Sequence, residues 1–342
     1  MNEVRLFAGV ALAALLLEVS PLAAPVTTAW REWLAANALP AAPKTVTAIE
    51  IAGKSLDPLS AALALRAVLP LEPTGIVFLD PITNDANTQL LISKLSDARV
   101  PIVFTTTERL DPLARVSVSE KVPALLRIAM LQPENHVAGG ISAGGQIVSR
   151  QNGRAVPSSS LQAFLLAKNI SPDAVSGRVP GMVRLGGALT LSTNAAGEPA
   201  PGPHVGDYVA RMNFGELMVR TERSEHGEIG ADLDALFRGR WVAVQLAGER
   251  GADCLAALLN GLVENPPPVG LAALGILLAV CVPLWPRRGR VLAACGAACA
   301  WALMALAFYA EFHFVVPLFP VSLLPVLAIV SARWKRFEVD AR

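Results

Sequence analysis

Long apolar stretches lie near both ends of the chain. They cover residues 6–26, 269–285, 291–310 and 314–332. The only charged residue in them is Glu18. A helix needs about 20 predominantly apolar residues to cross a membrane. The pattern therefore predicts four transmembrane helices, the last two forming an antiparallel hairpin around residues 311–313.

Basic residues flank these stretches on one side. Arg5 precedes the first stretch, residues 287–290 hold three arginines and residues 333–342 hold four basic residues. Loops on the cytoplasmic side carry an excess of Lys and Arg. We therefore expect a multi-pass protein of the bacterial inner membrane with both termini in the cytoplasm. The predicted order is a cytoplasmic segment at 1–5, a span at 6–26, a periplasmic domain at 27–268, spans at 269–285, 291–310 and 314–332, and a cytoplasmic tail at 333–342.

The first stretch has a second interpretation. Arg5, the apolar run and the small residues near position 23 also fit a cleaved signal peptide. Both interpretations export residues 27–268. A carboxylate is costly inside a span, so Glu18 is expected near the outer interface or facing the bundle, with a proton or ion role as the alternative.

The exported segment begins with alternating strand and helix patterns. Asp57 followed by proline is typical of a helix start. The predicted strands are 45–51, 75–79 and 101–107, and the helices between them are 58–69 and 88–97. A β-α-β-α-β order implies a parallel sheet covered by helices. The expected fold class is α/β, a three-layer domain with a mostly parallel central sheet.

The rest of the exported segment is less regular, and residues 139–153 are rich in turn-forming residues. Strands are predicted at 136–140, 182–192, 208–214 and 241–246, and helices at 158–168 and 253–262. An amphipathic connector at 30–39 is expected to follow the first span.

Composition narrows the class of protein. Hydrophobic residues make up 53% of the chain and charged residues 17%, against about 25% charged in ordinary soluble domains. This argues against a soluble cytosolic enzyme and against disorder. The net charge of +1 gives no indication of a nucleic-acid partner. Of the four cysteines, only Cys254 lies in the expected periplasmic domain, so no disulfide framework is predicted.

Three acidic residues are weak candidates for ligand binding. Glu50 lies in the first predicted strand, Asp80 ends the second, and Asp85 follows just beyond. Ligands of open α/β sheets bind outside the carboxyl ends of strands. Acids near Pro81 are also ordinary turn residues, and turn formation alone accounts for them.

Catalytic and cofactor motifs are incomplete. Residues 140–144 fit the G-x-S-x-G pattern around Ser142, but a turn and a strand follow where that motif needs a helix. Residues 53–55 resemble the end of a phosphate-binding loop, yet Ala48 stands where the required glycine belongs. No catalytic residue or cofactor is predicted, and an exported serine hydrolase remains a third alternative.

Metal ligands are sparse. The four histidines are not spaced as in zinc sites, and no metal is expected. Cys295 and Cys299 share a helix face, but the small residues around them favour close helix packing. The local charge cluster is interpreted as a solvated loop. Its members are Glu222, Glu225, His226 and Glu228.

Several motifs in order resemble one family, the second type of CHASE domain, an extracytoplasmic sensory domain of bacterial cyclases and histidine kinases. The similar segments are TVTAIEIAGKSL at 45–56, GIVFLDPI at 75–82, HVAGGISAGGQIVSRQNGRAVPS at 136–158, FGEL at 214–217 and LFRGRWVAVQL at 236–246. One span before the domain and three after it also match. Glu50, Gln245 and Asp253 lie where the sequence departs from the family pattern, so a family ligand site is not carried over to them.

The resemblance implies a sensor module that detects a periplasmic signal. Family members usually continue into a cytoplasmic output domain, whereas residues 333–342 are too few to form one. We therefore expect the signal to pass through the membrane helices to a separate signalling or membrane-complex protein. Homo-oligomerisation is compatible with this. The alternative is a structural or scaffolding subunit of an envelope complex. The ligand, the partner and the oligomeric state cannot be determined from the sequence.

Overall fold

The chain divides into two compact units. A computed structural model describes residues 2–18, 20–38, 44–83, 86–96, 98–106, 137–141, 147–151, 154–171, 174–177, 182–185, 189–193, 197–199, 201–225, 231–265, 269–286 and 289–329. One unit, here the helical unit, consists of Met1–Ala41, Gly202–His204 and Glu264–Arg342. The other, here the α/β unit, consists of Ala42–Pro201 and Val205–Val263.

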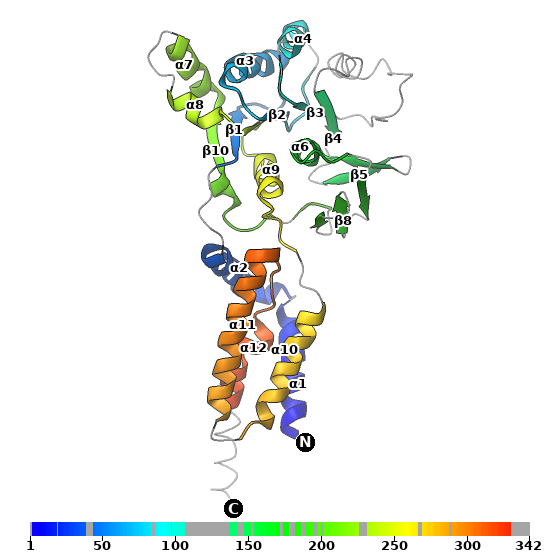
Figure 1. Cartoon of the computed structure of the whole chain (residues 1–342), viewed down its shortest axis with the longest axis vertical. Helices are drawn as coiled ribbons and strands as arrows, with labels where there is room; N and C mark the ends of the chain where they lie inside the picture. Colours follow the sequence, from blue (N-terminus) through cyan, green and yellow to red (C-terminus); the bar gives the residue numbers. More distant parts are fainter. Residues whose placement is uncertain are drawn as a thin grey trace, which may run out of the picture. The chain divides into compact units, whose positions relative to one another are not determined.

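A six-stranded sheet forms the centre of the α/β unit (Figure 1). Every neighbouring pair of strands is parallel. In spatial order the strands are β10 (Val209–Asn213), β1 (Val46–Ile51), β11 (Trp241–Leu246), β2 (Gly75–Phe78), β3 (Ile102–Thr106) and β4 (Val137–Ile141). The prediction of an α/β fold with a mostly parallel sheet is confirmed.

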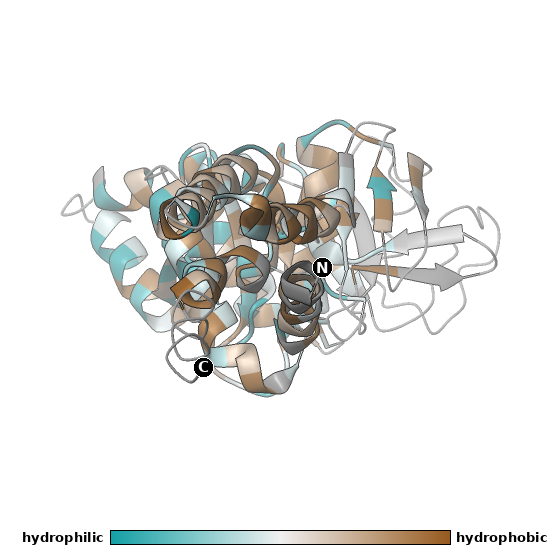
Figure 2. Cartoon of the chain, turned by 90° about the horizontal axis from the view of Figure 1, so that it is seen from below, coloured by the Kyte–Doolittle hydropathy of each residue, from teal (hydrophilic) through white to brown (hydrophobic). Residues whose placement is uncertain are grey.

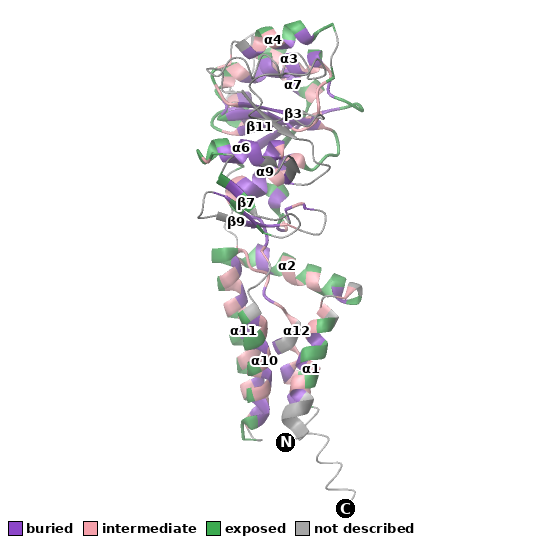
Figure 3. Cartoon of the chain, turned by 90° about the vertical axis from the view of Figure 1, so that its right-hand side faces the viewer, coloured by how far each residue is buried: buried purple, intermediate pink, exposed green. Residues whose placement is uncertain are grey.

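Helices cover both faces of this sheet (Figure 3). One face carries α3 (Pro58–Val68), α4 (Thr88–Ser96), α7 (Phe214–Glu225) and α8 (Ala231–Phe237). The other carries α6 (Ser159–Ala167) and α9 (Gly251–Asn260). The unit therefore has the expected three layers.

The start of α3 follows from its sequence. The Asp57 carboxylate accepts hydrogen bonds from the backbone N–H of Ser60 at 2.8 Å and from its hydroxyl at 2.7 Å. Pro58 occupies the first turn, where the lack of an N–H costs nothing. The predicted helix start is confirmed.

The core between the sheet and α3 is apolar and closely packed. Phe78 and Phe104 stack on neighbouring strands with ring centroids 4.8 Å apart. Buried Ile49 and Leu65 belong to the same core. On the opposite face, a Cβ added at Gly75 would lie 2.6 Å from the Trp241 ring, so this strand position requires glycine.

Two predictions for the α/β unit are wrong. Residues 182–192 do not form one strand; β8 (Met182–Leu185) and β9 (Leu189–Ser192) pair antiparallel beside β7 (Val175–Gly177), because the chain reverses between them. A further hairpin joins β5 (Val148–Gln151) and β6 (Arg154–Pro157). Glu222 and Glu225 of the expected loop belong to α7, where Glu216 and Arg220 form an i,i+4 pair.

The helical unit contains one helix of full spanning length. Among the described residues, only α11 (Arg290–Phe312) is long and apolar enough to cross a membrane; it has 23 residues. This matches the prediction at 291–310. The remaining elements are α1 (Asn2–Glu18), η1 (Pro21–Ala23), α2 (Ala24–Ala38), α10 (Val269–Cys281), η5 (Val282–Leu284) and α12 (Phe319–Ser322). A four-span topology is therefore not supported by helix length.

Prolines explain why the other expected spans are short or interrupted. The stretch at 6–26 is not one helix, because α1 ends at Glu18 before Pro21 and a new helix follows. The stretch at 269–285 changes to a 3-10 turn at Pro283. In the stretch at 314–332, the described residues 314–329 contain prolines at 317, 320 and 325, and the helical pieces among them are short.

The helical unit has its own core and an apolar exterior. Phe7, Leu34, Trp301 and Tyr309 are buried together. Most residues of its helices are hydrophobic (Figure 2), and several of the large apolar ones are exposed. The exposed leucines of α1, α10, η5 and α11 are Leu12, Leu16, Leu274, Leu277, Leu284, Leu292 and Leu303.

Candidate functional site

Charged side chains meet at the carboxyl ends of β1, β10 and β11. In the parallel register Glu50 lies beside Gln245 on one side and Asn213 on the other. Side chains alternate along a strand, so Glu50 shares with buried Ala48 the face that α9 covers. The sequence placed Glu50 near this edge of the sheet, and the structure agrees.

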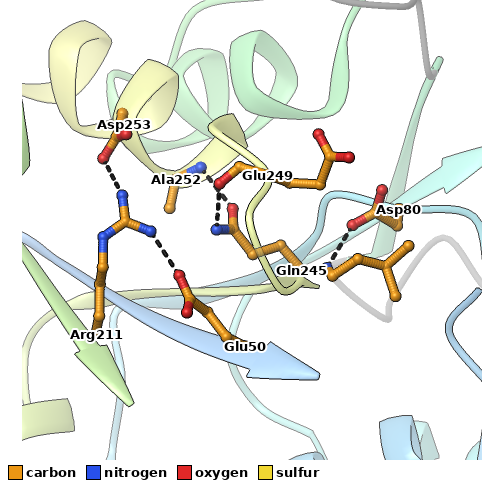
Figure 4. A network of polar contacts seen from close by, with 8 residues as sticks. Glu50, Asp80, Arg211, Gln245, Glu249, Ala252 and Asp253 are labelled. Atoms are coloured by element: carbon orange, nitrogen blue, oxygen red, sulfur yellow. Dashed lines mark hydrogen bonds and ion pairs between the residues drawn. The ribbon is translucent and has the colours of Figure 1, made fainter. Parts of the chain in front are cut away.

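Arg211 of β10 joins two carboxylates from different elements (Figure 4). Its Nη1 donates to Glu50 Oε1 at 2.6 Å, and its Nη2 donates to Asp253 Oδ1 of α9 at 2.5 Å. The exposed side-chain fractions are 37% for Arg211, 25% for Glu50 and 20% for Asp253. The cluster therefore ties an edge strand, the next strand and a helix together while remaining within reach of solvent.

The electrostatics of this cluster keep Arg211 charged. Burial by itself lowers the pKa of the guanidinium, but its hydrogen bond to Glu50 and the charge of Asp253 outweigh burial and raise that pKa. Two carboxylates share one cation, so the three groups sum to −1 when all are ionised. This net negative charge is suited to holding a polar or cationic group.

Gln245 fixes the turn between β11 and α9. It is fully buried. Its Oε1 accepts from the backbone N–H of Ala252 at 2.9 Å, and its Nε2 donates to the carbonyl of Glu249 at 2.8 Å. Both ends of the amide are thus satisfied by the turn that positions Asp253 (Figure 4).

Asp80 has a backbone partner at the same edge. Its Oδ2 accepts from the N–H of Leu246 at 2.7 Å, which links the end of β2 to the end of β11. Asp80 therefore has a structural role, because its carboxylate joins the ends of two neighbouring strands. Asp85, the third candidate, lies outside the described residues.

The sequence interpretation did not propose Arg211, Gln245 or Asp253 as site residues. The partners of Arg211 are 161 residues away (Glu50) and 42 residues away (Asp253) along the chain, and no local spacing indicates such pairs. A signal was nevertheless present, because a charged residue and an amide interrupt otherwise apolar strands. Neighbouring Cys254 adds no reactive thiol: burial raises its pKa to about 12, against a weaker lowering by Ser160, so the protonated form prevails at neutral pH.

A second polar cluster lies inside the helical unit. Glu264 is buried, and its two carboxylate oxygens have different partners. Arg31 of α2 forms an ion pair with Oε2, and the Tyr309 hydroxyl of α11 donates to Oε1 at 3.1 Å. Next to it, Asn265 pairs by its backbone N–H with the carbonyl of His313 at 2.9 Å. The chain entering α10 is thereby fastened to α2 and to the end of α11.

The other predicted residues do not assemble into a site. Glu18 turns toward the bundle, where it accepts from the N–H of Leu318 at 2.7 Å. Ser142, His226 and Glu228 lie outside the described residues. The turn at 53–55 is not followed directly by a helix, because α3 begins at Pro58. Within the described ranges, no group of three or more His, Cys, Asp or Glu side chains could hold a metal ion.

Comparisons with known proteins give no information about the function of these residues. No protein-family model, curated protein or solved structure matches the chain. The resemblance to the CHASE-type domain rests on the sequence segments quoted above.

Proposed function

We propose that the chain is a multi-pass inner-membrane protein whose α/β unit detects a periplasmic signal and relays it to a separate partner. The α/β unit is the sensor, and the helical unit is the membrane-embedded relay. Both termini lie in the cytoplasm in this proposal, as the distribution of Lys and Arg favours.

The position of α9 carries this proposal. Asp253 in its first turn is held by Arg211 at the sheet edge. At its other end, the Asn260 amide donates to the Thr45 hydroxyl at 2.7 Å. Four residues beyond Asn260 the chain reaches Glu264, which is fastened to two helices of the other unit. One short helix therefore links a partly exposed charged cluster to a buried polar cluster among apolar helices.

The apolar exterior of the helical unit supports membrane insertion. Large contiguous apolar surfaces on a protein mark contacts with a membrane or with a partner. Helix α1 has 17 residues, which gives about 25 Å at 1.5 Å per residue. That is shorter than the roughly 30 Å hydrocarbon core, but bilayers thin locally around short spans. Four crossings therefore remain our proposal, although among the described residues only α11 has full spanning length.

Signal detection would act through the Arg211 cluster. A ligand bearing a positive group can compete with Arg211 for Asp253 and Glu50, and this competition would release the start of α9. A ligand shifts such an equilibrium only by its difference in affinity for the two states. Couplings between distant sites are typically about 1–3 kcal/mol, or 5- to 150-fold in affinity.

Affinity purification tests this function. The full chain is tagged at its C-terminus, extracted from native membranes in mild detergent, and its co-purifying proteins are identified by mass spectrometry. The D253N variant removes the ion pair between α9 and Arg211 and leaves at most a neutral hydrogen bond, and the E216Q variant does the same to a surface Arg–Glu pair on α7 as the matched control. We expect a kinase, cyclase or other signalling enzyme whose recovery changes in D253N and not in E216Q.

The rival function is a structural subunit of an envelope complex. It is favoured by Asp80 and Gln245, whose polar atoms at the sheet edge are used in internal hydrogen bonds. A fixed set of transport or envelope proteins, recovered equally with wild type and D253N and without a signalling enzyme, would replace the sensor function by this one.

A further inference from the structure

We propose that η1 and α2 form an in-plane membrane helix that lies on a phospholipid surface. This inference rests on the membrane placement of the helical unit proposed above. It adds a second kind of lipid contact, in which residues 21–38 occupy the boundary between headgroups and acyl chains.

Helix α2 turns away from the direction of α1 after η1. It runs across one end of the bundle formed by α1, α10 and α11 (Figure 3). The Trp30 indole Nε1 donates to the carbonyl of Val316 at 3.0 Å, and Arg31 pairs with Glu264. These two contacts fix both the position and the rotation of α2.

The fixed rotation divides α2 into three sides. The inner side contains buried Leu34 and Ala35. A second side is exposed and largely apolar: Val26 is 47% exposed and Trp33 is 41% exposed, while Leu22 of η1 before them is 84% exposed. Exposed Asn37 lies on the same side, where its amide donates to the Trp33 carbonyl at 2.7 Å. The third side is exposed and polar.

The polar side carries Thr28 and Glu32. At 100° per residue, Val26 and Trp33 point in nearly the same direction, whereas Thr28 and Glu32 lie roughly a quarter of a turn or more away from it. A helix fully immersed in lipid would place these polar side chains in hydrocarbon, which is unfavourable. A helix in water would expose the apolar side to solvent. A helix lying in the interface accounts for both.

The chemistry of the apolar side favours lipid as its occupant. Trp33 stacks on Trp30 with ring centroids 5.1 Å apart and an interplanar angle of 10°, so its ring is supported in an outward position. Tryptophan concentrates at membrane interfaces because its ring is apolar and its N–H is polar. The preceding helix α1 also has exposed leucines, Leu12 and Leu16, which face lipid in the proposed topology.

The charges on α2 predict its lipid preference. Arg31 is engaged with Glu264, and the exposed side carries the negative Glu32. Basic interfacial helices gain affinity from anionic lipid. This helix lacks that contribution, so its insertion should be equally deep in neutral and in anionic bilayers.

Depth-dependent fluorescence quenching tests the proposal in the full chain. The protein is reconstituted into phosphatidylcholine vesicles, with and without bromine on the acyl chains close to the headgroups, and iodide serves as the aqueous quencher. Two variants place a reporter on opposite sides of α2: W33F/V26W on the apolar side and the matched control W33F/T28W on the polar side. Subtracting the W33F spectrum isolates each reporter from the remaining tryptophans.

The expected result is loss of W33F/V26W fluorescence with brominated lipid, little loss with iodide, and the reverse for W33F/T28W. The same pattern should persist when a third of the lipid is replaced by phosphatidylglycerol. Equal iodide quenching of both reporters would overturn the proposal. A V26W reporter shielded from both quenchers would also overturn it, because a protein or a second copy of the chain would then cover the apolar side of α2.

A reporter on α11 separates this failure from failure of the proposed function. L303W replaces an exposed leucine in the middle of that helix, and it is measured in vesicles whose lipids carry bromine near the ends of the acyl chains. Quenching of L303W by brominated lipid, with none at V26W, would reject the in-plane helix alone. Absence of quenching at L303W would reject the membrane placement itself.

Discussion

Removing Arg211 is the sharpest test of the charged cluster at the sheet edge. In R211M the aliphatic part of the side chain is kept, but the guanidinium bonds to Glu50 and Asp253 are lost. Two carboxylates then face each other without the intervening cation. The start of α9 and the edge strand β10 lose their common anchor.

The size of the effect follows from exposure. Partly exposed ion pairs contribute about 0.2–1 kcal/mol each, so two pairs predict a loss of roughly 0.5–2 kcal/mol. For domains of this size, 1 kcal/mol corresponds to about 2–4 °C in Tm, which gives a decrease of about 1–8 °C. The matched control R220M removes a single i,i+4 pair with Glu216 on α7 and should cost only about 0.3–0.5 kcal/mol.

Thermal unfolding of the detergent-purified full chain, followed by tryptophan fluorescence, measures both variants. Salt supplies a second criterion, because exposed ion pairs are screened at 1 M ionic strength. The difference between wild type and R211M should therefore shrink in high salt. A decrease in Tm no larger than that of R220M, or one that salt leaves unchanged, would show that the cluster does not stabilise the sheet edge electrostatically.

Three further changes test the packing and the polar contacts. Asp57→Ala should cost about 1 kcal/mol of unfolding free energy through the loss of a helix N-cap. Burial alone would raise the pKa of Asp57, but its hydrogen bonds with Ser60 and nearby backbone outweigh burial and lower that pKa below 3.8. The stabilisation by the carboxylate is therefore complete above pH 3.8 and is lost as the pH falls through the lowered pKa, which denaturation at pH 7 and pH 3 would measure. Gly75→Ala should cost about 1–3 kcal/mol by overpacking against Trp241, measured as a lower urea midpoint. Tyr309→Phe should cost about 0.5–1.5 kcal/mol through loss of one hydrogen bond to Glu264, measured by thermal unfolding.

Each of these has a matched comparison. Asp57→Asn keeps a capping side chain and should be nearly as stable at pH 7 while losing the dependence on pH. Gly270→Ala adds a methyl group where no atom lies within 4 Å and should not destabilise the protein by overpacking. For Tyr309→Phe, an unchanged cost in an E264Q background would show that the two side chains are not coupled.

The local elements of the α/β unit could be predicted from the sequence. Apolar strand patterns located β1, β2, β3, β10 and β11 to within one or two residues. Asp57 and Pro58 located the start of α3. These features depend on neighbours within a few positions, and hydrophobic periodicity and capping report such neighbours directly. The α/β class followed, because alternating strands and helices permit few other arrangements.

The elements that were missed depended on contacts elsewhere in the chain. The end of α7, with Glu222 and Glu225, is interpreted from the sequence as part of a solvated loop because it is highly charged, and the helix is recognised only once it packs on β1 and α3. The helix ends near Glu18 and Pro283 also differed from the expected spans. Apolar composition indicates a membrane segment but does not decide where proline forces the helix to stop.

The sequence by itself determined the strands β1, β2, β3, β10 and β11 and the start of α3, that the sheet is parallel, and that Glu50 and Asp80 lie toward its carboxyl edge. Only the tertiary structure decided the strand order, which inserts β11 between β1 and β2 and adds β10 outside β1. That order brings Arg211 to Glu50 and Asp253 across separations of 161 and 42 residues. Such pairs arise from the packing of whole elements, because local spacing specifies a residue's face on its own strand and not the strand that will lie beside it.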